Sequence, residues 1–259
     1  MTEHEGQELI SVILPVYNGE QLIRSSVSSV LTQTYKNLEL IIIDDASDDN
    51  THGICRELSQ QDSRIKILAN RSNRGVLGSR ARAVDMAKGE WIAFIDADDQ
   101  WQEEKLEKQI ALRDSTGCDI VFTGSAFTNE DGEPYEWIMH VPAEVDYKRL
   151  LKQNVISNSS VLVRKKDFVK HSPFGDPGRN MHEDFACWLS MLKSGLCACG
   201  IDEPLITYRV SKGSRAGNKF RAARMNLNTY KYIGLNFFSR LYYESCYMVN
   251  GLRKHRHFR

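Results

Sequence analysis

Short apolar runs alternate with longer amphipathic stretches along the first part of the chain. The apolar, β-branched runs predict buried strands at Leu9–Leu14, Leu38–Ile43, Ile65–Leu68 and Trp91–Ile95. Between them, apolar residues at helical spacing predict helices over about Gln21–Thr32, over the segment after Ser47 to about Gln60, and over Leu77–Ala87. Strands that alternate with helices in this way predict an α/β fold with a mainly parallel central sheet flanked by helices.

The second half of the chain is less regular. Phe185, Trp188, Leu189 and Leu192 fall at i, i+3, i+4 and i+7, which is the apolar stripe of an amphipathic helix. The other predicted segments are a helix over about Gln102–Asp114, strands at Asp119–Thr123, Ser160–Val163 and Pro204–Tyr208, a turn at Asn129–Pro134 and a Gly/Pro loop at Pro173–Arg179. Because no linker or repeat interrupts the pattern, we expect one domain over residues 1–211. Residues 212–259 are expected to form a helical basic tail that is not an independent domain.

Acidic residues gather where two of the predicted strands end. Asp44 and Asp45 follow the second strand, and Asp96, Asp98 and Asp99 follow the fourth. The carboxyl ends of parallel strands are where α/β sheets bind ligands. Clustered carboxylates there suit Mg²⁺ or Mn²⁺, held partly by protein and partly by substrate phosphates. A plainer alternative for Asp99 is that it caps the helix that follows.

The turn after the first strand, Pro15–Asn18, carries a candidate base-binding site. A tyrosine just past a strand end, here Tyr17, offers a flat ring to a base. A carboxylate of Asp44 or Asp45 can then accept the ring N3–H of uracil. Alternatively, Tyr17 packs on the sheet and the two aspartates start an Asx turn with Ser47. No G-x-G-x-x-G or P-loop motif follows the strand, which disfavours dinucleotide and P-loop sites.

Arginines near the third predicted helix are candidates for phosphate binding. Gly75 allows a tight turn into this helix, and Arg80, one turn further on, can reach pyrophosphate oxygens from the same sheet edge. In the plainer interpretation Arg80 is a solvated helix residue, although Arg82 suits that role better.

The segment His182–Asp184 comes just before the apolar helix stripe and carries the candidate catalytic base. Acids in a first helical turn often only complement the helix dipole, which is the plainer interpretation of both carboxylates. A general base must reach the acceptor hydroxyl from a rigid support. Asp184, beside the apolar face anchored by Phe185 and Trp188, meets this demand better than Glu183.

Charge is distributed unevenly, although the formal net charge of the chain is zero. Residues 212–259 carry eleven Lys and Arg against one acid, Glu244, which leaves a net charge of −10 on residues 1–211. Apolar and aromatic side chains lie near one face of a single helix predicted from about Asn218 to Asn250. A basic amphipathic helix of this kind can lie in an anionic membrane interface. The alternative is a helix that packs on the body with a frayed basic end.

The six cysteines show no C-x-x-C spacing, and we expect reduced thiols rather than a zinc site. The polar, acidic first residues are not typical of a signal peptide. No apolar run approaches the roughly 20 residues that a membrane-spanning helix needs. The expected location is therefore cytoplasmic, peripheral on the inner face of the plasma membrane.

Together these motifs resemble the family 2 glycosyltransferases, which have the GT-A nucleotide-diphospho-sugar transferase fold, over about residues 10 to 210. The segments that carry the resemblance are Ser11–Asn18 (SVILPVYN), Val30–Tyr35 (VLTQTY), Leu40–Thr51 (LIIIDDASDDNT), Asn73–Arg80, Gly89–Asp99 (GEWIAFIDADD) and His182–Asp184. Several ordered motifs at the right spacing make the resemblance specific. Val155–Arg164 (VISNSSVLVR) is similar to the same segment of bacterial surface-polysaccharide transferases, including those for teichuronic acid and O-antigen.

The resemblance implies a role for each matched residue. Asp184 would be the general base of an inverting displacement, and Asp98 would bind the Mn²⁺ or Mg²⁺ that bridges the two phosphates. Tyr17 would stack on uracil and Asp45 would accept its N3–H. The residues implied to bind the nucleotide sugar are Pro15, Tyr17, Asp45, Gly75, Arg80 and Asp96, and the supporting candidates are Asp99, Glu183, His182 and Trp188. Arg80 is preferred to Arg82, although Ala81 stands where many relatives have Asn.

The activity implied is inverting, metal-dependent transfer of a hexose-type sugar from a UDP-sugar to a hydroxyl of a bacterial cell-surface glycan. The expected partners are the UDP-sugar donor, a lipid-linked saccharide acceptor and an anionic inner-membrane surface that meets the tail, with no nucleic acid. One alternative is a sugar-nucleotide nucleotidyltransferase, although Pro15–Gly19 lacks the Gly-rich, Arg/Lys-containing loop of that class. The other is a non-catalytic nucleotide-sugar or glycan-binding protein on the same fold.

Overall fold

Helices and strands alternate along residues 7–173, 180–210 and 219–255, which are the parts of the chain that the computed structural model describes. The strands are β1 Ile10–Val16, β2 Leu38–Asp44, β3 Ile65–Ala69, β4 Trp91–Phe94, β5 Gln100–Trp101, β6 Ile120–Thr128, β7 Leu162–Arg164 and β8 Ala198–Arg209. The helices are α1 Ile23–Leu31, α2 Thr51–Gln61, α3 Gly75–Met86, α4 Lys105–Thr116, α5 Tyr147–Lys152, α6 Lys165–His171, α7 Glu183–Lys193, α8 Lys219–Tyr232 and α9 Phe237–His255, with a 3₁₀ turn η1 at Asn158–Ser160.

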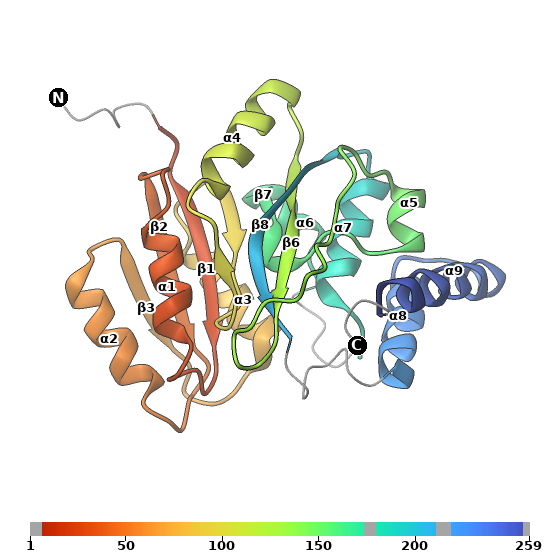
Figure 1. Cartoon of the computed structure of the whole chain (residues 1–259). Coiled ribbons are helices and arrows are strands. Elements are labelled where there is room, and N and C mark those ends of the chain that lie inside the picture. The colour runs from red at the N-terminus through yellow and green to blue at the C-terminus, as the bar shows by residue number, and fades with distance from the viewer. Residues whose placement is uncertain (1–6, 174–179, 211–218, 256–259) are drawn as a thin grey trace.

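One mixed sheet, in the order β3-β2-β1-β4-β7-β6-β8-β5, runs through the molecule (Figure 1). The first four strands are parallel, and β6 pairs with β8 in the same way. By contrast, β7 is antiparallel to both β4 and β6, and β5 is antiparallel to β8. The register pairs Val16 with Asp44, so the carboxyl ends of β1 and β2 lie side by side. The residues that follow both strands are therefore at the same edge of the sheet.

The strands of the first half are buried on both faces because helices cover both. Ile13 of β1 belongs to a core with residues of α3, α6, α7 and α8. Its neighbours Val12 and Leu14 point to the opposite face and pack with residues of α1, α2 and α4. This two-sided burial explains why β1 and β2 are mainly apolar rather than alternating. Their buried polar residues, Ser11 and Glu39, are hydrogen-bonded to each other.

Several predicted boundaries differ from the structure in the second half. The short strand β5 and the helices α5 and α6 were not predicted, and β6 and β8 are longer than the predicted strands at 119–123 and 204–208. The pairing of β6 with β8 shifts register around Gly124, which interrupts the alternation of apolar and polar residues. A Cβ at Gly124 would come within 2.9 Å of two backbone carbonyl oxygens, so the shift requires glycine there. Most of the predicted loop at Pro173–Arg179 lies outside the described residues.

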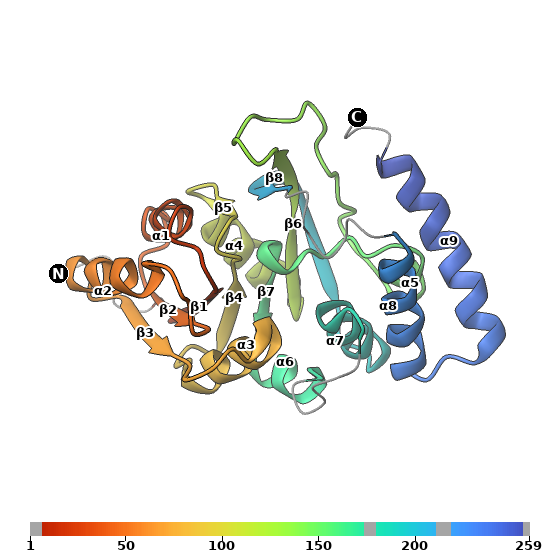
Figure 2. The ribbon, with the colours of Figure 1, turned by 90° about the horizontal axis from the view of Figure 1, so that it is seen from below.

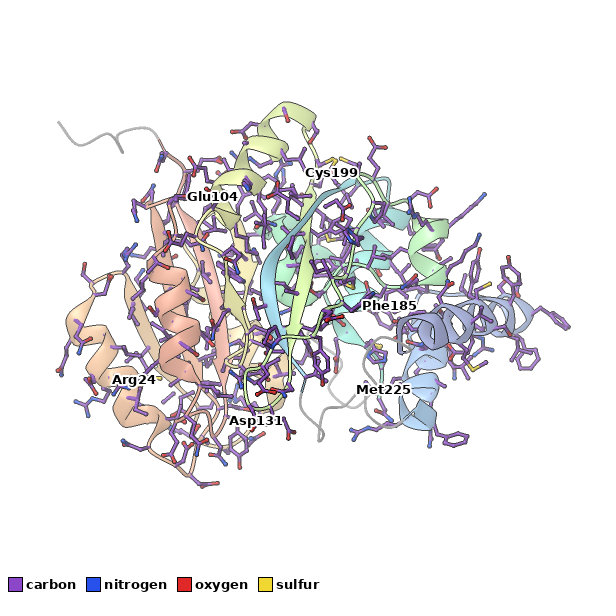
Figure 3. The ribbon with its side chains drawn as sticks, in the orientation of Figure 1. Arg24, Glu104, Asp131, Phe185, Cys199 and Met225 are labelled. Atoms are coloured by element: carbon purple, nitrogen blue, oxygen red, sulfur yellow. A yellow bond between two sulfur atoms is a disulfide. The ribbon has the colours of Figure 1, made fainter. Side chains whose placement is uncertain are left out.

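A disulfide joins Cys118, just before β6, to Cys199 of β8, with the two Cα atoms 6.1 Å apart (Figure 3). The pairing of Ile120 with Ala198 brings the two cysteines together. The expectation that all six thiols are reduced is therefore wrong for this pair. The spacing of the cysteines did not predict this disulfide, because the two residues are 81 positions apart.

The tail forms two helices rather than the single predicted one. The break follows Gly234, whose φ of +84° favours glycine, and the Asn236 side chain then accepts a hydrogen bond from the Ser239 amide at the start of α9. Both helices pack on the body, α8 against α7 and α9 against α5 and α8 (Figure 2). Tyr230 of α8 is fully buried and its hydroxyl donates to the carbonyl of Leu151 at 2.8 Å. No helix among the described residues combines the length and apolar character needed to cross a membrane.

Glu244 of α9 gives the tail a pH-dependent stability. The side chain is only 6% exposed, and burial raises its pKa to about 7 despite a hydrogen bond from Asn226. Because this pKa lies above that of the unfolded chain, the folded state binds the extra proton and stability falls as the pH rises from about 4.5 to about 7. Glu244→Gln is expected to raise the free energy of unfolding at pH 8 by about 1–3 kcal/mol, with little gain at pH 4. Urea denaturation at both pH values measures this, with exposed Glu103→Gln as the control. An unchanged pH slope in the Glu244 variant would contradict it.

Candidate active site

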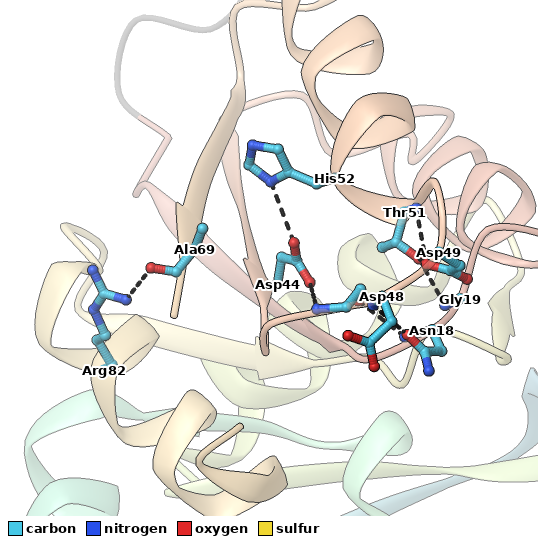
Figure 4. A network of polar contacts seen from close by, with 10 residues as sticks. Asn18, Gly19, Asp44, Asp48, Asp49, Thr51, His52, Ala69 and Arg82 are labelled. Carbon is cyan, nitrogen blue, oxygen red and sulfur yellow. Dashed lines mark hydrogen bonds and ion pairs between the residues drawn. The ribbon is translucent and has the colours of Figure 1, made fainter. Parts of the chain in front are cut away.

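Asp44 and Asp45, at the end of β2, have different surroundings. The Asp44 carboxylate accepts the Ser47 amide at 3.0 Å and faces the His52 ring at 3.2 Å, so Asp44 makes the predicted turn (Figure 4). Asp45 does not take part in that turn. Its carboxylate accepts the Asn70 side-chain amide at 2.6 Å and the Arg74 backbone N–H at 2.9 Å. Asp45 is therefore fixed from the end of β3 and the loop before α3.

The turn after β1 presents Tyr17 to solvent. The Tyr17 side chain is 49% exposed and its hydroxyl donates to Asp48 at 3.2 Å, so the ring does not pack on the sheet. The next residues are held by two hydrogen bonds, from the Asp48 amide to the Asn18 side chain at 2.9 Å and from the Gly19 amide to the Thr51 hydroxyl at 2.8 Å (Figure 4). Pro15 lies buried within β1, two positions before Tyr17.

The two arginines of α3 have separate partners. Gly75, at φ +72°, starts the helix, and from there Arg80 reaches the carboxylate of Asp96 in an ion pair. Arg82 instead donates to the carbonyl of Ala69 and the side chain of Asn70, both at 2.7 Å. Arg82 thus braces the end of β3, whereas Arg80 faces the acidic loop. A cavity of about 400 Å³ lies beside Arg82. It is lined by Ala69, Asn70, Arg71, Ser72, Arg74 and Arg82.

Ser159 of η1 organises the acidic loop Asp96–Asp99. Its hydroxyl accepts the Asp96 amide at 3.1 Å and donates to the Asp99 carboxylate at 2.5 Å. Asp99 is fully buried and also accepts the backbone amide of Arg209 at 3.2 Å. Burial, followed by the charges of Asp96 and Asp98, raises the pKa of Asp99. Asp99 is not the cap of α4, which begins only at Lys105.

Asp98 lies partly buried in the same loop. Among the described residues no other residue donates a hydrogen bond to it, and its pKa is raised by burial and then by the charge of Asp96. Crowded carboxylates that lack proton donors are relieved by a divalent cation. The described part of the chain holds no cluster of three or more His, Cys, Asp or Glu that could enclose a metal unaided. One or two carboxylates are the protein ligands that Mg²⁺ takes where substrate phosphates supply other ligands.

Asp184 lies at the start of α7, a helix that is firmly anchored. Phe185 and Trp188 are buried in the core, with the Trp188 ring 5.8 Å from that of Phe168. The His182 amide donates to the Thr229 hydroxyl of α8 at 3.1 Å. Asp184 is partly exposed, and one of its oxygens accepts the Phe185 amide at 2.8 Å. The second oxygen is left for another partner. Glu183 is partly exposed at the same helix start.

Tyr208, near the end of β8, relates Asp184 to the acidic loop. Burial raises the pKa of this phenol, and the charges of Asp99, Asp96, Asp98 and Asp184 raise it further, in that order. All four carboxylates therefore act electrostatically on one side chain. Three residues of this arrangement, Ser159, Tyr208 and Arg209, were not predicted as site residues. Ser159 does fall within the segment VISNSSVLVR, which the sequence comparison of motifs had singled out.

Residues 11–174 match the model of the family described as glycosyl transferase family 2. The chain is a family 2 glycosyltransferase. This confirms the resemblance and the class of enzyme predicted from the motifs. The match covers the turn after β1, the end of β2 and the acidic loop, but it stops before Asp184.

Curated relatives of this glycosyltransferase match nearly its whole length. It is 34% identical to a putative teichuronic acid biosynthesis glycosyltransferase, TuaG, from Bacillus subtilis, over 95% of this chain and 97% of that protein. It is 36% identical to WfgD of Escherichia coli, a UDP-Glc:alpha-D-GlcNAc-diphosphoundecaprenol beta-1,3-glucosyltransferase, over 95% of each chain. A second E. coli protein of the same description, WfaP, is 35% identical over 96% of each.

Solved structures confirm the predicted fold class. The glycosyltransferase superposes on Staphylococcus aureus TarS, crystallised with UDP-GlcNAc, with a TM-score of 0.69 over 92% of this chain and 71% of that one, at 19% identity. It also superposes on the mannosyltransferase PcManGT from Pyrobaculum calidifontis, in complex with GDP-Man and Mn²⁺, with a TM-score of 0.68 over 92% of this chain and 69% of that one, at 17% identity. At such identities the likeness concerns the fold, which is the GT-A arrangement of a central sheet with flanking helices.

Proposed function

We propose that this glycosyltransferase moves a hexose-type sugar from a UDP-sugar to a hydroxyl of a lipid-linked bacterial cell-surface glycan, with inversion at the anomeric carbon. The observation that carries the proposal is the acidic loop at the end of β4, which the Ser159 hydroxyl and the Arg209 backbone amide hold through Asp96 and the buried Asp99. We assign the diphosphate with its metal to this loop, and the catalytic base to Asp184 at the start of α7.

The nucleotide is held at the ends of β1 and β2. The exposed ring of Tyr17 stacks on uracil, and the Asp45 carboxylate, already aimed by Asn70 and Arg74, accepts the N3–H. Asp96 lies near the ribose, and Arg80, which contacts Asp96, exchanges part of that ion pair for phosphate oxygens when the nucleotide binds.

Asp98 is the residue that would hold Mn²⁺ or Mg²⁺, with Asp99 shaping the loop from its buried position. When bound, such an ion neutralises charge on the two phosphates and makes UDP a better leaving group. The fixed loop contributes orientation, because Ser159 holds the Asp96 amide and the Asp99 carboxylate from one hydroxyl. Asp98 is left free to bind.

Asp184 acts as the general base. It removes the proton of the acceptor hydroxyl while that oxygen bonds to the anomeric carbon and the bond from this carbon to UDP breaks. The attack comes from the side opposite to UDP, so the product has the opposite anomeric configuration. Phe185 and Trp188 hold the start of α7 rigidly enough for this role, while Glu183 and His182 support it from the same turn.

The substrate class is supported by the names of the relatives. WfaP and WfgD are described as acting on UDP-Glc and a GlcNAc-diphosphoundecaprenol acceptor, and TuaG as taking part in teichuronic acid biosynthesis. Both descriptions concern bacterial surface polysaccharides, and two name a lipid-linked acceptor. By similarity we propose a UDP-hexose or UDP-N-acetylhexosamine donor and an undecaprenyl-diphosphate-linked acceptor, used at the cytoplasmic face of the membrane.

The test is a turnover assay with the purified full-length protein. UDP-Glc, UDP-Gal, UDP-GlcNAc, UDP-GalNAc and UDP-glucuronic acid are supplied in turn with Mn²⁺, with and without a synthetic GlcNAc-diphosphate-lipid. We expect acceptor-dependent UDP release with one donor, and a product whose anomeric configuration is opposite to that of the donor by NMR. Retained configuration would refute the single displacement. Formation of a nucleotide sugar from a sugar phosphate, or UDP-sugar binding without turnover, would favour the nucleotidyltransferase or the binding protein.

A further inference from the structure

Over residues 237–251 of α9, the part whose side chains the structure describes, the solvent-facing side is apolar. After Phe237, the exposed side chains of this part recur at the spacing of one helical face, and all but Ser245 are apolar: Phe238, Leu241, Tyr242, Ser245, Met248 and Val249. We call these residues the α9 stripe. Phe238 is 80% exposed, and Phe237 beside the stripe is 58% exposed. A stripe of large apolar side chains in water marks a surface that binds something apolar.

The α9 stripe is not the side of α9 that packs on the rest of the protein. The opposite side of α9 already packs inward, where Glu244 is buried, the Tyr247 ring lies 5.9 Å from that of Phe185 and the Tyr243 ring lies 6.4 Å from that of Tyr230. The helix forms the side of the molecule farthest from β3, and its outer side chains point away from the sheet (Figures 1, 2 and 3). The α9 stripe is therefore available to a partner.

The tail that carries the stripe is positively charged. Residues 212–259 have eleven Lys and Arg and one acid, Glu244, which is buried. Arg224 and Lys231 of α8 are exposed. A partner that offers an apolar layer together with negative charge complements both features.

We propose that the α9 stripe docks on an anionic lipid bilayer, with α9 lying in the plane of the interface. The acyl region accepts the aromatic and aliphatic side chains, and anionic headgroups pair with basic side chains of the tail. A second copy of the chain fits less well, because two tails of the same positive charge would face each other. The stripe lies on the half of the molecule that holds Asp184, whose charge contributes to raising the pKa of Tyr247 on the inner side of α9. Docking would thus bring the acceptor side of the site to the lipid surface, although the docking itself does not depend on the proposed reaction.

The experiment uses full-length protein and sedimentation with vesicles of phosphatidylcholine alone or with about 30% phosphatidylglycerol. Deleting the tail would expose the buried Tyr230, so point substitutions are used. The stripe variant is Phe238→Ser with Leu241→Ser and Met248→Ser, and the matched control is Met86→Ser with Val169→Ser, which are 54% and 46% exposed on α3 and α6. Circular dichroism verifies that both variants fold.

Wild-type protein and the control are expected to bind the anionic vesicles, and to bind those of phosphatidylcholine alone at least about tenfold more weakly. The stripe variant is expected to bind the anionic vesicles about tenfold to a hundredfold more weakly than wild type. This fold-change corresponds to the free energy of burying one large apolar side chain. Arg224→Gln with Lys231→Gln should weaken binding and flatten its salt dependence. Equal vesicle binding by the stripe variant and wild type would overturn the proposal. So would a wild-type dimer, detected by light scattering, that the stripe substitutions convert to monomer without affecting vesicle binding.

Discussion

Asp184→Asn is expected to slow sugar transfer by about 10²- to 10⁴-fold, the range that general-base catalysis supplies, while UDP affinity changes by less than about twofold. Asn keeps the oxygen that accepts the Phe185 amide, so the start of α7 is preserved. It removes the negatively charged oxygen that accepts the proton of the acceptor hydroxyl. The rate is measured by UDP release at saturating donor and acceptor, and UDP affinity by calorimetry.

The neighbouring acid provides the matched control for this substitution. Glu183→Gln removes a carboxylate from the same first turn of α7, and with it a similar favourable interaction with the helix dipole. We expect it to retain most of the transfer activity. If Glu183→Gln is the more damaging change, the base is Glu183. If Asp184→Asn abolishes UDP binding, Asp184 belongs to the donor site.

Asp98→Ala is expected to remove the gain in UDP affinity that Mn²⁺ provides, by about tenfold or more, and to reduce transfer at least in proportion. The expectation follows from the place of Asp98 in the acidic loop and from its pKa, which burial and Asp96 raise. Titration calorimetry of UDP in Mn²⁺ and in EDTA measures the difference. Asp131→Ala, an exposed acid of the 129–134 turn, controls for the loss of one negative charge. An Asp98 variant with the same dependence on Mn²⁺ as wild type would assign the metal to another residue.

The first half of the fold could be predicted because its strands are buried on both faces. The strands β1, β2 and β4 are buried at every position and mainly apolar, and acids mark the ends of two of them, with Asp44 at the end of β2 and Asp96 just after β4. The second half could not be predicted as well. The strand β8 carries exposed Asp202 and Glu203 in its middle, and its register with β6 shifts at Gly124, so neither alternation nor a continuous run was visible.

The candidate site was predicted where its residues follow a strand end or start a helix, as Asp45, Asp98 and Asp184 do. Local sequence patterns did not indicate which of two adjacent acids takes which role. Asp44 and Asp45 differ in their partners. Ser47 and His52 contact Asp44, whereas Asn70 and Arg74 reach Asp45 from further along the chain. Ser159 and Arg209 lie 60 and 110 positions from Asp99, so no local pattern could associate them with it.

Asp99 connects three segments that the ribosome makes at very different times. The parallel strands β1 to β4, with Asp45 and both of its partners, lie within the first hundred residues and are synthesised early. Ser159 emerges later, and the backbone amide of Arg209 that completes the shell around Asp99 emerges last. Because domains form as the chain is made, a nascent chain can assemble its nucleotide half before the acidic loop is locked. The hydrogen bonds around Asp99 are therefore complete only after the end of β8 has been translated.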